Sequence, residues 1–421
     1  MSERPAPRLR TVDRQRIIPA MPLEDLLDSD HQARLVWDFC MGLDLTPLYD
    51  SIRSRVGGPG HPAIDPRLCV AVWLYATLEG VGSARALAWL CENHHAFRWL
   101  SGGVSVNHHT LSDFRVGHLE FLDDLLTHSV AVLREQDLVD LNRVAIDGMR
   151  VRASAGAASF RRQQTLGEHL QEARDQVARL KEELDDDPAA PSRRSAAARA
   201  RAAREREGRV RQALARLPEL EAKKKADQKD KARASTTDPQ ATVMKMADGG
   251  YRPAFNVAYA AATAGQVIVA VSVITTGSDM GQITAALDQV ERRFDVRPKE
   301  ALADGGFAKH EDIEQAQRQG TTVYVPVPEP KDASRDRHEP LPGDSTEIAE
   351  WRQRMKTEEA KEVYKERAST IECCNAQARN RGLIRLLVRG LEKVKAIALG
   401  YALAHNVRRG FGLRGQLATA C

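Results

Sequence analysis

Two aspartates of the chain stand where an apolar, β-rich run gives way to glycine. Asp147 follows the run RVAI and precedes Gly148, and Asp304 follows ALA and precedes Gly305. Carboxylates are depleted in strands, so an acid at the end of an apolar run needs a reason. One reason is structural, because aspartate before glycine is a good turn former. The other is a shared site, which we expect if the two strands lie side by side.

Carboxylates at neighbouring strand ends would suit phosphodiester chemistry. Cleavage by water needs a nucleophile that is activated at neutral pH and a leaving 3′-oxygen whose charge is neutralised, and two Mg²⁺ ions about 3.5–4 Å apart supply both. Magnesium takes hard oxygen ligands and keeps several waters, so a few carboxylates suffice. We therefore expect Asp147, Asp304 and a third acid to hold two Mg²⁺ ions, for which Mn²⁺ can substitute.

The third acid is expected in the segment KEVYKERASTIECCNAQARNRG, which offers three glutamates. Glu362 and Glu366 lie among lysines and have the spacing of surface ion pairs on a helix. Glu372 lies among Ile371, Cys373 and Cys374, where an unpaired carboxylate is least comfortable. The residues alone favour Glu372 without excluding the other two.

The stretch from Arg379 to Arg414 is strongly basic, and its only acid is Glu392. The net charge of the whole chain, +4 from 62 Lys+Arg against 58 Asp+Glu, says little by comparison. Helical neighbour spacing puts several of the arginines on one face. Such a face is either solvated or a binding surface for phosphates. The candidate DNA-binding residues are Arg379, Arg381, Arg385, Arg389 and Lys393.

Composition narrows the class of protein. Hydrophobic residues make up 42% and charged residues 29%, as in ordinary globular proteins. No apolar run approaches the roughly 20 residues that span a membrane, and no apolar stretch follows the charged N-terminus. The six cysteines have no C-x-x-C spacing, which argues against a zinc site or a disulfide framework. We expect a cytoplasmic protein without a membrane partner.

Residues 20–140 have the pattern of a helical domain. Asp65 and Pro66 suit a helix start, Gly80 a helix end, and Ser83 the cap of one further helix over SARALAWLCENHHAFRWL. Another helix is expected from near Asn107 or Thr110. Short helices joined by turns fit a helix-turn-helix DNA binder and an ordinary helical bundle equally well.

A long charged stretch from 160 to 235 carries a heptad pattern. Its apolar residues alternate at spacings of four and three: Leu166, Leu170, Ala173, Val177, Leu180 and Leu184. The run DDDPAAPS interrupts the pattern, and Val210, Leu214 and Leu217 belong to a second helical run. Two helices around a proline-rich turn predict an antiparallel coiled-coil hairpin that projects from the fold.

The remaining segments predict an α/β fold with a mixed sheet. FNVAYAA and QVIVAVSVI are two antiparallel strands around TAG, and EALAD and TTVYVPV are two further strands. Helices are expected at 280–293 and 309–319, a loop at 329–345, and helix from 346 to near 409. The order of elements could set the strand of Asp147 beside the strand of Asp304.

Several long motifs, in this order, resemble the DDE transposases of bacterial insertion sequences in the broad IS-four and IS-five superfamily. HPAIDPRLCVAVWLYATLEGVGSARALAWL, FRWLSG and HHTLSDFRVGH are similar to the domain that opens these proteins. VAIDGMRVRASA and ALADGGFAKHED are similar to the two aspartate segments, and RASTIECCNAQARNRGLIRLLVRGLEKVKAIALGYALAHNVRR to the third-acid region. The resemblance covers about residues 17–410.

The resemblance implies an RNase H-like catalytic core in which Asp147, Asp304 and Glu372 hold the metal ions. Tyr364 and Arg367 resemble the Tyr and Arg that precede the glutamate, and we expect both to bind DNA. Four features depart from the family pattern. The interval from Arg367 to Glu372 is one residue longer, Arg379 replaces a lysine, and the second-strand and first-aspartate motifs read Phe255-Asn256-Val257-Ala258 and Met149-Arg150.

The expected organisation has three parts. Residues 1–140 form a helical DNA-binding domain, 141–160 and 236–415 the catalytic domain, and 161–235 the hairpin insertion. The expected function is metal-dependent hydrolysis at terminal inverted repeats followed by strand transfer into target DNA, by a homodimer in the bacterial nucleoid. An RNase H-like nuclease or resolvase without strand transfer, and a decayed or domesticated DNA-binding protein, are the alternatives.

Overall fold

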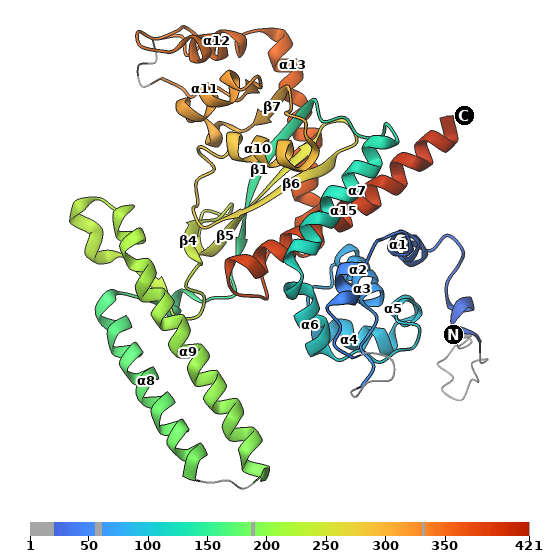
Figure 1. Ribbon diagram of the computed structural model, residues 1–421. Coiled ribbons are helices and arrows are strands. Elements are labelled where there is room, and N and C mark those ends of the chain that lie inside the picture. Colours follow the sequence, from blue (N-terminus) through green and yellow to red (C-terminus); the bar gives the residue numbers. More distant parts are fainter. Residues whose placement is uncertain (1–20, 55–60, 187–189, 331, 333, 421) are drawn as a thin grey trace, which may run out of the picture.

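A mixed sheet forms the centre of the chain in the computed structural model, which describes all residues except 1–20, 55–60, 187–189, 331, 333 and 421 (Figure 1). Side chains of 183–194 and 416–420 also lie outside the description. The strands of the sheet are β1 (Arg143–Arg152), β4 (Thr242–Lys245), β5 (Tyr251–Ala262), β6 (Val267–Ile274), β7 (Glu300–Ala303) and β8 (Thr322–Tyr324).

The strand order is β4-β5-β1-β7-β8, and β6 also pairs with β5. β1 is antiparallel to β5 and parallel to β7, β5 is antiparallel to β6, and β7 is parallel to β8. The mixed α/β architecture is therefore confirmed, as is the placement of the Asp147 strand beside the Asp304 strand. The sequence reading missed β4 and the separate two-stranded ribbon of β2 (Phe160–Arg161) and β3 (Ala234–Ser235).

One expectation about β1 is wrong. The strand does not end at Asp147 but continues through Gly148 to Arg152. β5 is the cause, because its residues from Ala254 to Ala262 pair with β1 along nearly its whole length, from Arg152 back to Val144. Asp147 therefore lies in the middle of a strand. The parallel pairing with β7 stops one residue before it.

Helices pack against the sheet and beside one of its edges. α10 (Ile283–Phe294) and α11 (His310–Arg318) follow β6 and β7, and a long loop leads from β8 to α12. The C-terminal part consists of α12 (Thr346–Arg354), α13 (Glu358–Arg367), the π-helical turn η5 (Ala368–Glu372), α14 (Cys373–Asn380) and α15 (Leu391–Ala420). Two 3₁₀ turns, η2 (Ala157–Ser159) and η4 (Gly305–Phe307), follow β1 and β7.

The N-terminal region is helical, with a start at each position where the sequence offers a capping side chain. Asp65 accepts from the backbone N–H of Arg67, and Ser83 and Asn107 cap in the same manner. The expected single helix after Ser83 is divided at His94, whose extended backbone and side chain cap a second helix. The elements are η1 (Leu23–Leu26), α1 (Gln32–Met41), α2 (Thr46–Asp50), α3 (Pro66–Leu78), α4 (Ala84–Asn93), α5 (His95–Leu100), α6 (His108–Gly117) and α7 (Leu119–Glu135).

α15 joins the helical region to the sheet. It lies beside α7 in Figure 1 and packs against α3, α6 and α7 as well as against β6. Buried side chains of the N-terminal helices and of the sheet form one continuous hydrophobic core. The last helix therefore holds the two parts of the chain together.

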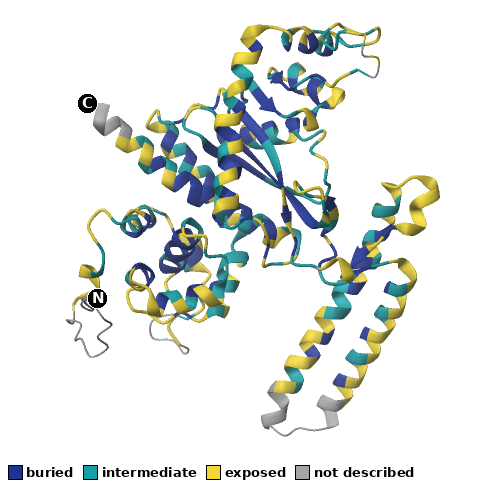
Figure 2. Cartoon of the chain, turned by 180° about the vertical axis from the view of Figure 1, so that it is seen from behind, coloured by how far each residue is buried: buried dark blue, intermediate teal, exposed yellow. Residues whose placement is uncertain are grey.

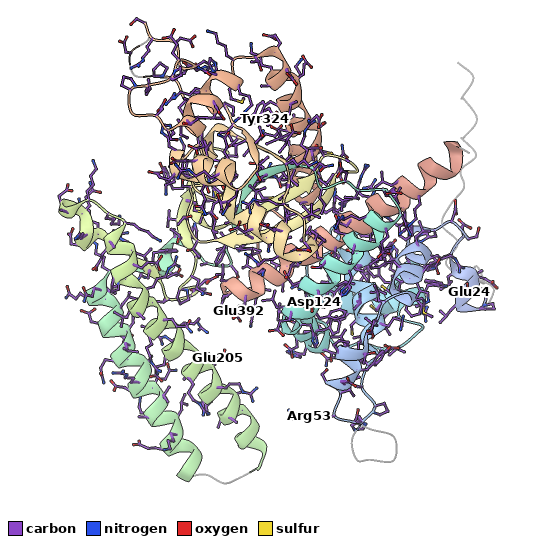
Figure 3. All side chains as sticks on the ribbon, turned by 45° about the horizontal axis from the view of Figure 1, so that its top comes forward. Glu24, Arg53, Asp124, Glu205, Tyr324 and Glu392 are labelled. Atoms are coloured by element: carbon purple, nitrogen blue, oxygen red, sulfur yellow. The ribbon has the colours of Figure 1, made fainter. Side chains whose placement is uncertain are left out.

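Two long helices, α8 (Gln163–Asp186) and α9 (Ala190–Ala222), project from the sheet as an antiparallel pair, followed by η3 (Ala226–Lys231) (Figure 1). The buried positions lie on their facing sides, and the outer sides are exposed (Figure 2). Leu166 and Leu180 are buried as the heptad pattern predicts, whereas the side chain of Leu184 and the residues 187–189 of the expected turn lie outside the description. Figure 3 labels Glu205 on α9, far from Tyr324 in the sheet.

No helix among the described residues is both long enough and apolar enough to cross a membrane.

Candidate active site

The register of β1 and β7 brings Asp147 and Asp304 together. The last parallel pair is Ile146 with Ala303, and each aspartate is the next residue of its chain segment. Asp304 then begins η4, where its Oδ1 accepts from the backbone N–H of Gly306 at 2.7 Å. The two acids therefore lie side by side at the point where the parallel pairing ends.

Arg367 lies between these aspartates and Glu372. Its guanidinium Nη2 is 3.6 Å from Oδ2 of Asp147 and 3.8 Å from Oδ2 of Asp304, and Nη1 is 2.5 Å from Oε1 of Glu372. The arginine side chain is only 10% exposed, whereas the side chains of Asp304 and Glu372 are 43% and 54% exposed. One buried cation thus contacts all three acids predicted from the sequence.

The π-helical turn explains how Glu372 reaches Arg367. In an α-helix, residues that share a face are three or four positions apart, but these two are five apart. A π turn closes i→i+5 hydrogen bonds and accommodates one extra residue, and such turns are frequent at functional sites. The turn from Ala368 to Glu372 thus accounts for the longer interval noted in the sequence. It keeps the glutamate on the side of the arginine.

Asn375 orients the carboxylate of Asp147 through a hydrogen bond. Its Nδ2 donates to Oδ2 of Asp147 at 2.9 Å, and the other aspartate oxygen accepts from the backbone N–H of Gly148 at 2.9 Å. Asn375 is 1% exposed, and its own Oδ1 has no hydrogen-bond partner within the described part of the chain. Sequence reasoning missed this residue. Its position, three after Glu372 on a helix, was the available signal.

The surroundings of Asp147 make its carboxyl group hard to ionise. Burial is the main cause and raises the pKa to about 6, and the charge of Asp304 adds to the rise. The guanidinium of Arg367 and the hydrogen bond from Asn375 act in the opposite direction. Strongly shifted carboxyls in a shared cluster are typical of functional sites.

Tyr364 also belongs to this cluster. It lies one turn before Arg367 on α13 and is partly buried. Burial raises the pKa of its phenol, and the nearby charges of Arg367, Asp304, Glu372 and Asp147 act on it. The five residues Tyr364, Arg367, Glu372, Asp147 and Asp304 are therefore brought together.

Asn256 and Asp279 lie next to Gly148, on the face of β1 opposite to the Asp147 side chain. Tyr259 is paired directly with Asp147 and shares its face, where the tyrosine hydroxyl donates to the carbonyl oxygen of Ala398 in α15 at 3.0 Å. Asn256 is three residues from Tyr259 and so points to the other face, where its Nδ2 donates to Oδ1 of Asp279 at 2.6 Å. Asp279 was not expected at the site, because the polar or small residues TTGS separate it from the apolar run of β6.

The basic residues after the site do not share one helical face, contrary to the expectation. The helix ends at Asn380, and residues 381–390 form turns because Gly382 and Gly390 have φ of 96° and 89°. Within this segment the backbone of Arg385 forms an isolated parallel β-bridge with that of Arg152 at the end of β1. Arg381 is 8% exposed, so it is a buried residue and not a surface contact.

The other basic candidates are exposed. Arg379 ends α14, Arg385 and Arg389 lie in the turns, and Lys393 lies in the first turn of α15, next to Glu392, which Figure 3 labels. The charge of Arg389 also acts on Arg209 of α9: it helps to lower the pKa of Arg209, for which burial is the larger cause. The exposed cations therefore continue from the site toward the base of the hairpin.

The chemistry of the donor set fits a hard divalent cation. Three carboxylates converge, and the buried Oδ1 of Asn375 beside Asp147 lacks a partner in the described chain. Oxygen donors of this kind are what Mg²⁺ prefers. The guanidinium of Arg367 lies among the acids, however, and the described residues contain no group of three or more His, Cys, Asp or Glu side chains gathered for a metal ion.

Two family models match the chain. Residues 21–117 match a model described as a transposase domain (DUF772), and residues 335–411 match a model described as a transposase DDE domain. The first match covers the helices from η1 to α6, and the second includes Arg367, Glu372 and Asn375 but neither aspartate. No curated protein and no solved structure matches significantly. Together with the convergence of the three acids, the two matches support a DDE transposase of insertion sequences.

Proposed function

We propose that the protein cuts DNA at the terminal inverted repeats of its element and joins the freed 3′ ends to target DNA. The single observation that carries the proposal is the convergence of Asp147, Asp304 and Glu372 on Arg367, from segments far apart in the sequence. An RNase H-like core is supported by the strand pattern. In it, a central strand has an antiparallel partner on one side and a parallel one on the other.

The three acids are the proposed ligands of two Mg²⁺ ions, with Mn²⁺ as a substitute. When bound, such ions activate water or a 3′-hydroxyl as nucleophile and neutralise the leaving oxygen. Asp147 offers the oxygen that Asn375 orients, and Asp304 is held by the backbone of Gly306. Arg367 must give up part of its contact with these acids before a divalent cation can enter.

Arg367 and Tyr364 are the proposed contacts to the DNA strand at the site. Guanidinium groups pair with phosphate oxygens as readily as with carboxylates, so Arg367 can exchange one for the other. The transfer would couple the arrival of the phosphate to release of the acids. Tyr364, whose phenol is held protonated by burial, can donate a hydrogen bond to the same phosphate.

Away from the acids, we assign the DNA backbone to the exposed cations Arg379, Arg385, Arg389 and Lys393. The N-terminal helices up to about residue 140 are proposed to bind the terminal repeats. Short helices joined by turns can place one helix in the major groove of DNA. The hairpin of 161–235 is proposed as an insertion into a catalytic domain formed by 141–160 and 236–415. Two DNA ends require two sites, hence a homodimer acting on nucleoid DNA in the cytoplasm.

The test is cleavage of a labelled duplex that carries the terminal repeat, by wild type and by Asp304→Asn, with and without Mg²⁺. Metal-dependent nicking at the 3′ end by wild type alone supports the proposal. A second duplex in the reaction detects strand transfer, and nicking without any joined product would favour a nuclease or resolvase. DNA binding without cleavage by either protein would contradict the enzymatic assignment and leave a DNA-binding protein.

A further inference from the structure

The carboxylate of Asp279 packs directly on the strand that carries Asp147. It lies in the loop between β6 and α10, and its Oδ1 accepts from Nδ2 of Asn256 at 2.6 Å. A Cβ atom built on Gly148 would lie only 2.1 Å from this oxygen and 2.8 Å from Oδ1 of Asn256. The absence of a side chain at Gly148 is therefore what lets Asp279 reach β1.

The local structure does not require this carboxylate. The N-terminus of α10 is capped by Asp312, whose Oδ2 and Oδ1 accept from the backbone N–H groups of Ile283 and Thr284 at 2.8 and 3.1 Å. Asp279 forms no ion pair with any described residue. Arg150, whose charge acts to lower the pKa of Asp279, donates to the carbonyl oxygens of Lys245 and Gly277.

Asn256 supplies a second and independent observation. It is 0% exposed, and its Oδ1, on the Gly148 side, has no hydrogen-bond partner among the residues described. A buried amide oxygen without a partner is unfavourable unless a donor or a cation completes it. The oxygen and the carboxylate of Asp279 therefore form one incomplete set of hard oxygen donors.

Asp304 connects this set to the site. It follows the last residue of β7, so no neighbouring strand residue confines it to either face of β1. Asp304 follows Ala303, which pairs with Ile146, only two residues before the Gly148 on which Asp279 packs. Its charge also contributes to the raised pKa of Asp279, for which burial is the larger cause. Two carboxylates that repel each other across a strand edge create a demand for positive charge between them.

We propose that Asp279 is a fourth acid of the site, held by Asn256 over Gly148, and that it binds a divalent cation together with Asp304. This inference rests on the proposed function. It also gives a role to Asn256, one of the sequence features that the other three acids leave unexplained. The cation is held either directly or through a water that Asp279 and Oδ1 of Asn256 share.

The experiment measures Mn²⁺ binding to the full-length protein without DNA, by the electron paramagnetic resonance signal of the free ion. Asp279→Asn is expected to weaken binding about 10- to 100-fold, the usual effect of losing a supporting group at a metal site. Glu311→Gln is the matched control, because Glu311 is 76% exposed on α11 and should bind as wild type does. Wild-type affinity in Asp279→Asn would overturn the inference.

Gly148→Ala provides a second variant that leaves every carboxylate in the chain. The added Cβ must displace Asp279, so the same loss of Mn²⁺ affinity is expected. Thermal unfolding of each variant checks that it is folded. Asp304→Asn separates the two proposals. If it loses Mn²⁺ while Asp279→Asn and Gly148→Ala bind as wild type does, only this inference is wrong. If Asp304→Asn also binds normally, the proposed metal site itself is wrong.

Discussion

Asn375 donates its amide hydrogen to Oδ2 of Asp147 at 2.9 Å, from a helix that follows the aspartate by more than 200 residues in the chain. The contact fixes the direction in which the aspartate presents its other lone pairs, and it favours the charged carboxylate. Because the donor is on α14, directly after the π turn, the orientation of Asp147 depends on the same helix that carries Glu372.

We expect Asn375→Ala to lower the cleavage rate about 100-fold, the order of loss that a small misplacement in an active site produces. Losing the hydrogen bond also removes one of the effects that keep the pKa of Asp147 from rising further. The acidic limb of the pH–rate profile should therefore move to higher pH. Asn380→Ala, an exposed asparagine at the end of the same helix, is the control and should change neither.

Asp147→Asn should stabilise the protein at neutral pH when no divalent ion is present. The carboxyl titrates near 3.8 when unfolded and near 6 when folded, so the folded state binds the extra proton between these values. Stability from this residue is thus lost as pH rises through about 6, by at most about 3 kcal/mol. Thermal unfolding in EDTA should show the variant above wild type at pH 7.5 and level with it near pH 4. An equal difference at both pH values would contradict the assigned cause.

Arg367→Gln should separate metal binding from cleavage. Without the guanidinium among the three acids, a divalent cation no longer competes with a fixed positive charge, so Mn²⁺ should bind about tenfold more tightly in the absence of DNA. Cleavage should nevertheless fall at least 100-fold, because the phosphate contact is lost. Weaker Mn²⁺ binding in this variant would show that Arg367 does not stand in the place of a cation.

Deletion of Ser369 tests the π turn. The residue is exposed and lies within the turn, so its loss converts five positions between Arg367 and Glu372 into four, the ordinary helical spacing. We expect the variant to fold and to keep cleavage within about tenfold of wild type. Deletion of Lys365, an exposed residue of the regular helix α13, rotates Tyr364 away from Arg367 and should abolish cleavage. An equal loss of cleavage in both deletion variants would show that the π turn does not compensate for one extra residue.

The basic residues should divide into two classes. Arg385→Ala and Arg389→Ala, at exposed positions, should weaken DNA binding and each reduce the slope of log K against log salt by about 0.9. Arg381→Ala should instead lower the melting temperature, because the Arg381 side chain is buried and its Nη2 donates to Oε1 of Gln377 at 3.4 Å. A binding titration at four salt concentrations, beside a melting curve, distinguishes the classes.

Hydrophobic periodicity and capping residues were sufficient to predict most helices and strands. Asp65, Ser83 and Asn107 cap helices where the sequence places them. Periodicity could not predict that β1 continues past Gly148, because the pairing that extends the strand comes from β5, about 100 residues later. The same limit applies to the basic stretch, whose spacing is helical although Gly382 and Gly390 turn the chain.

At the site, the sequence indicated the acids that follow apolar runs. It did not indicate the residues whose role depends on tertiary contacts. Asp147 and Asp304 interrupt apolar runs, which is visible in one dimension. Asn375 and Asp279 have ordinary neighbours in the sequence, and their importance arises only from what the fold places beside them. The contact of Arg367 with Glu372 likewise depends on the π turn.

The path of the chain through the sheet also sets the order in which the parts of the proposed active site appear during synthesis. β1 emerges from the ribosome early, but its partners β5 and β7 follow only after the whole hairpin has been made. The third acid and Asn375 come later still, and α15, which fastens the helical region to the sheet, is last. A nascent chain therefore contains its N-terminal helices long before it has a complete set of acids, so the proposed cleavage must wait until the segment with Glu372 and Asn375 has been made.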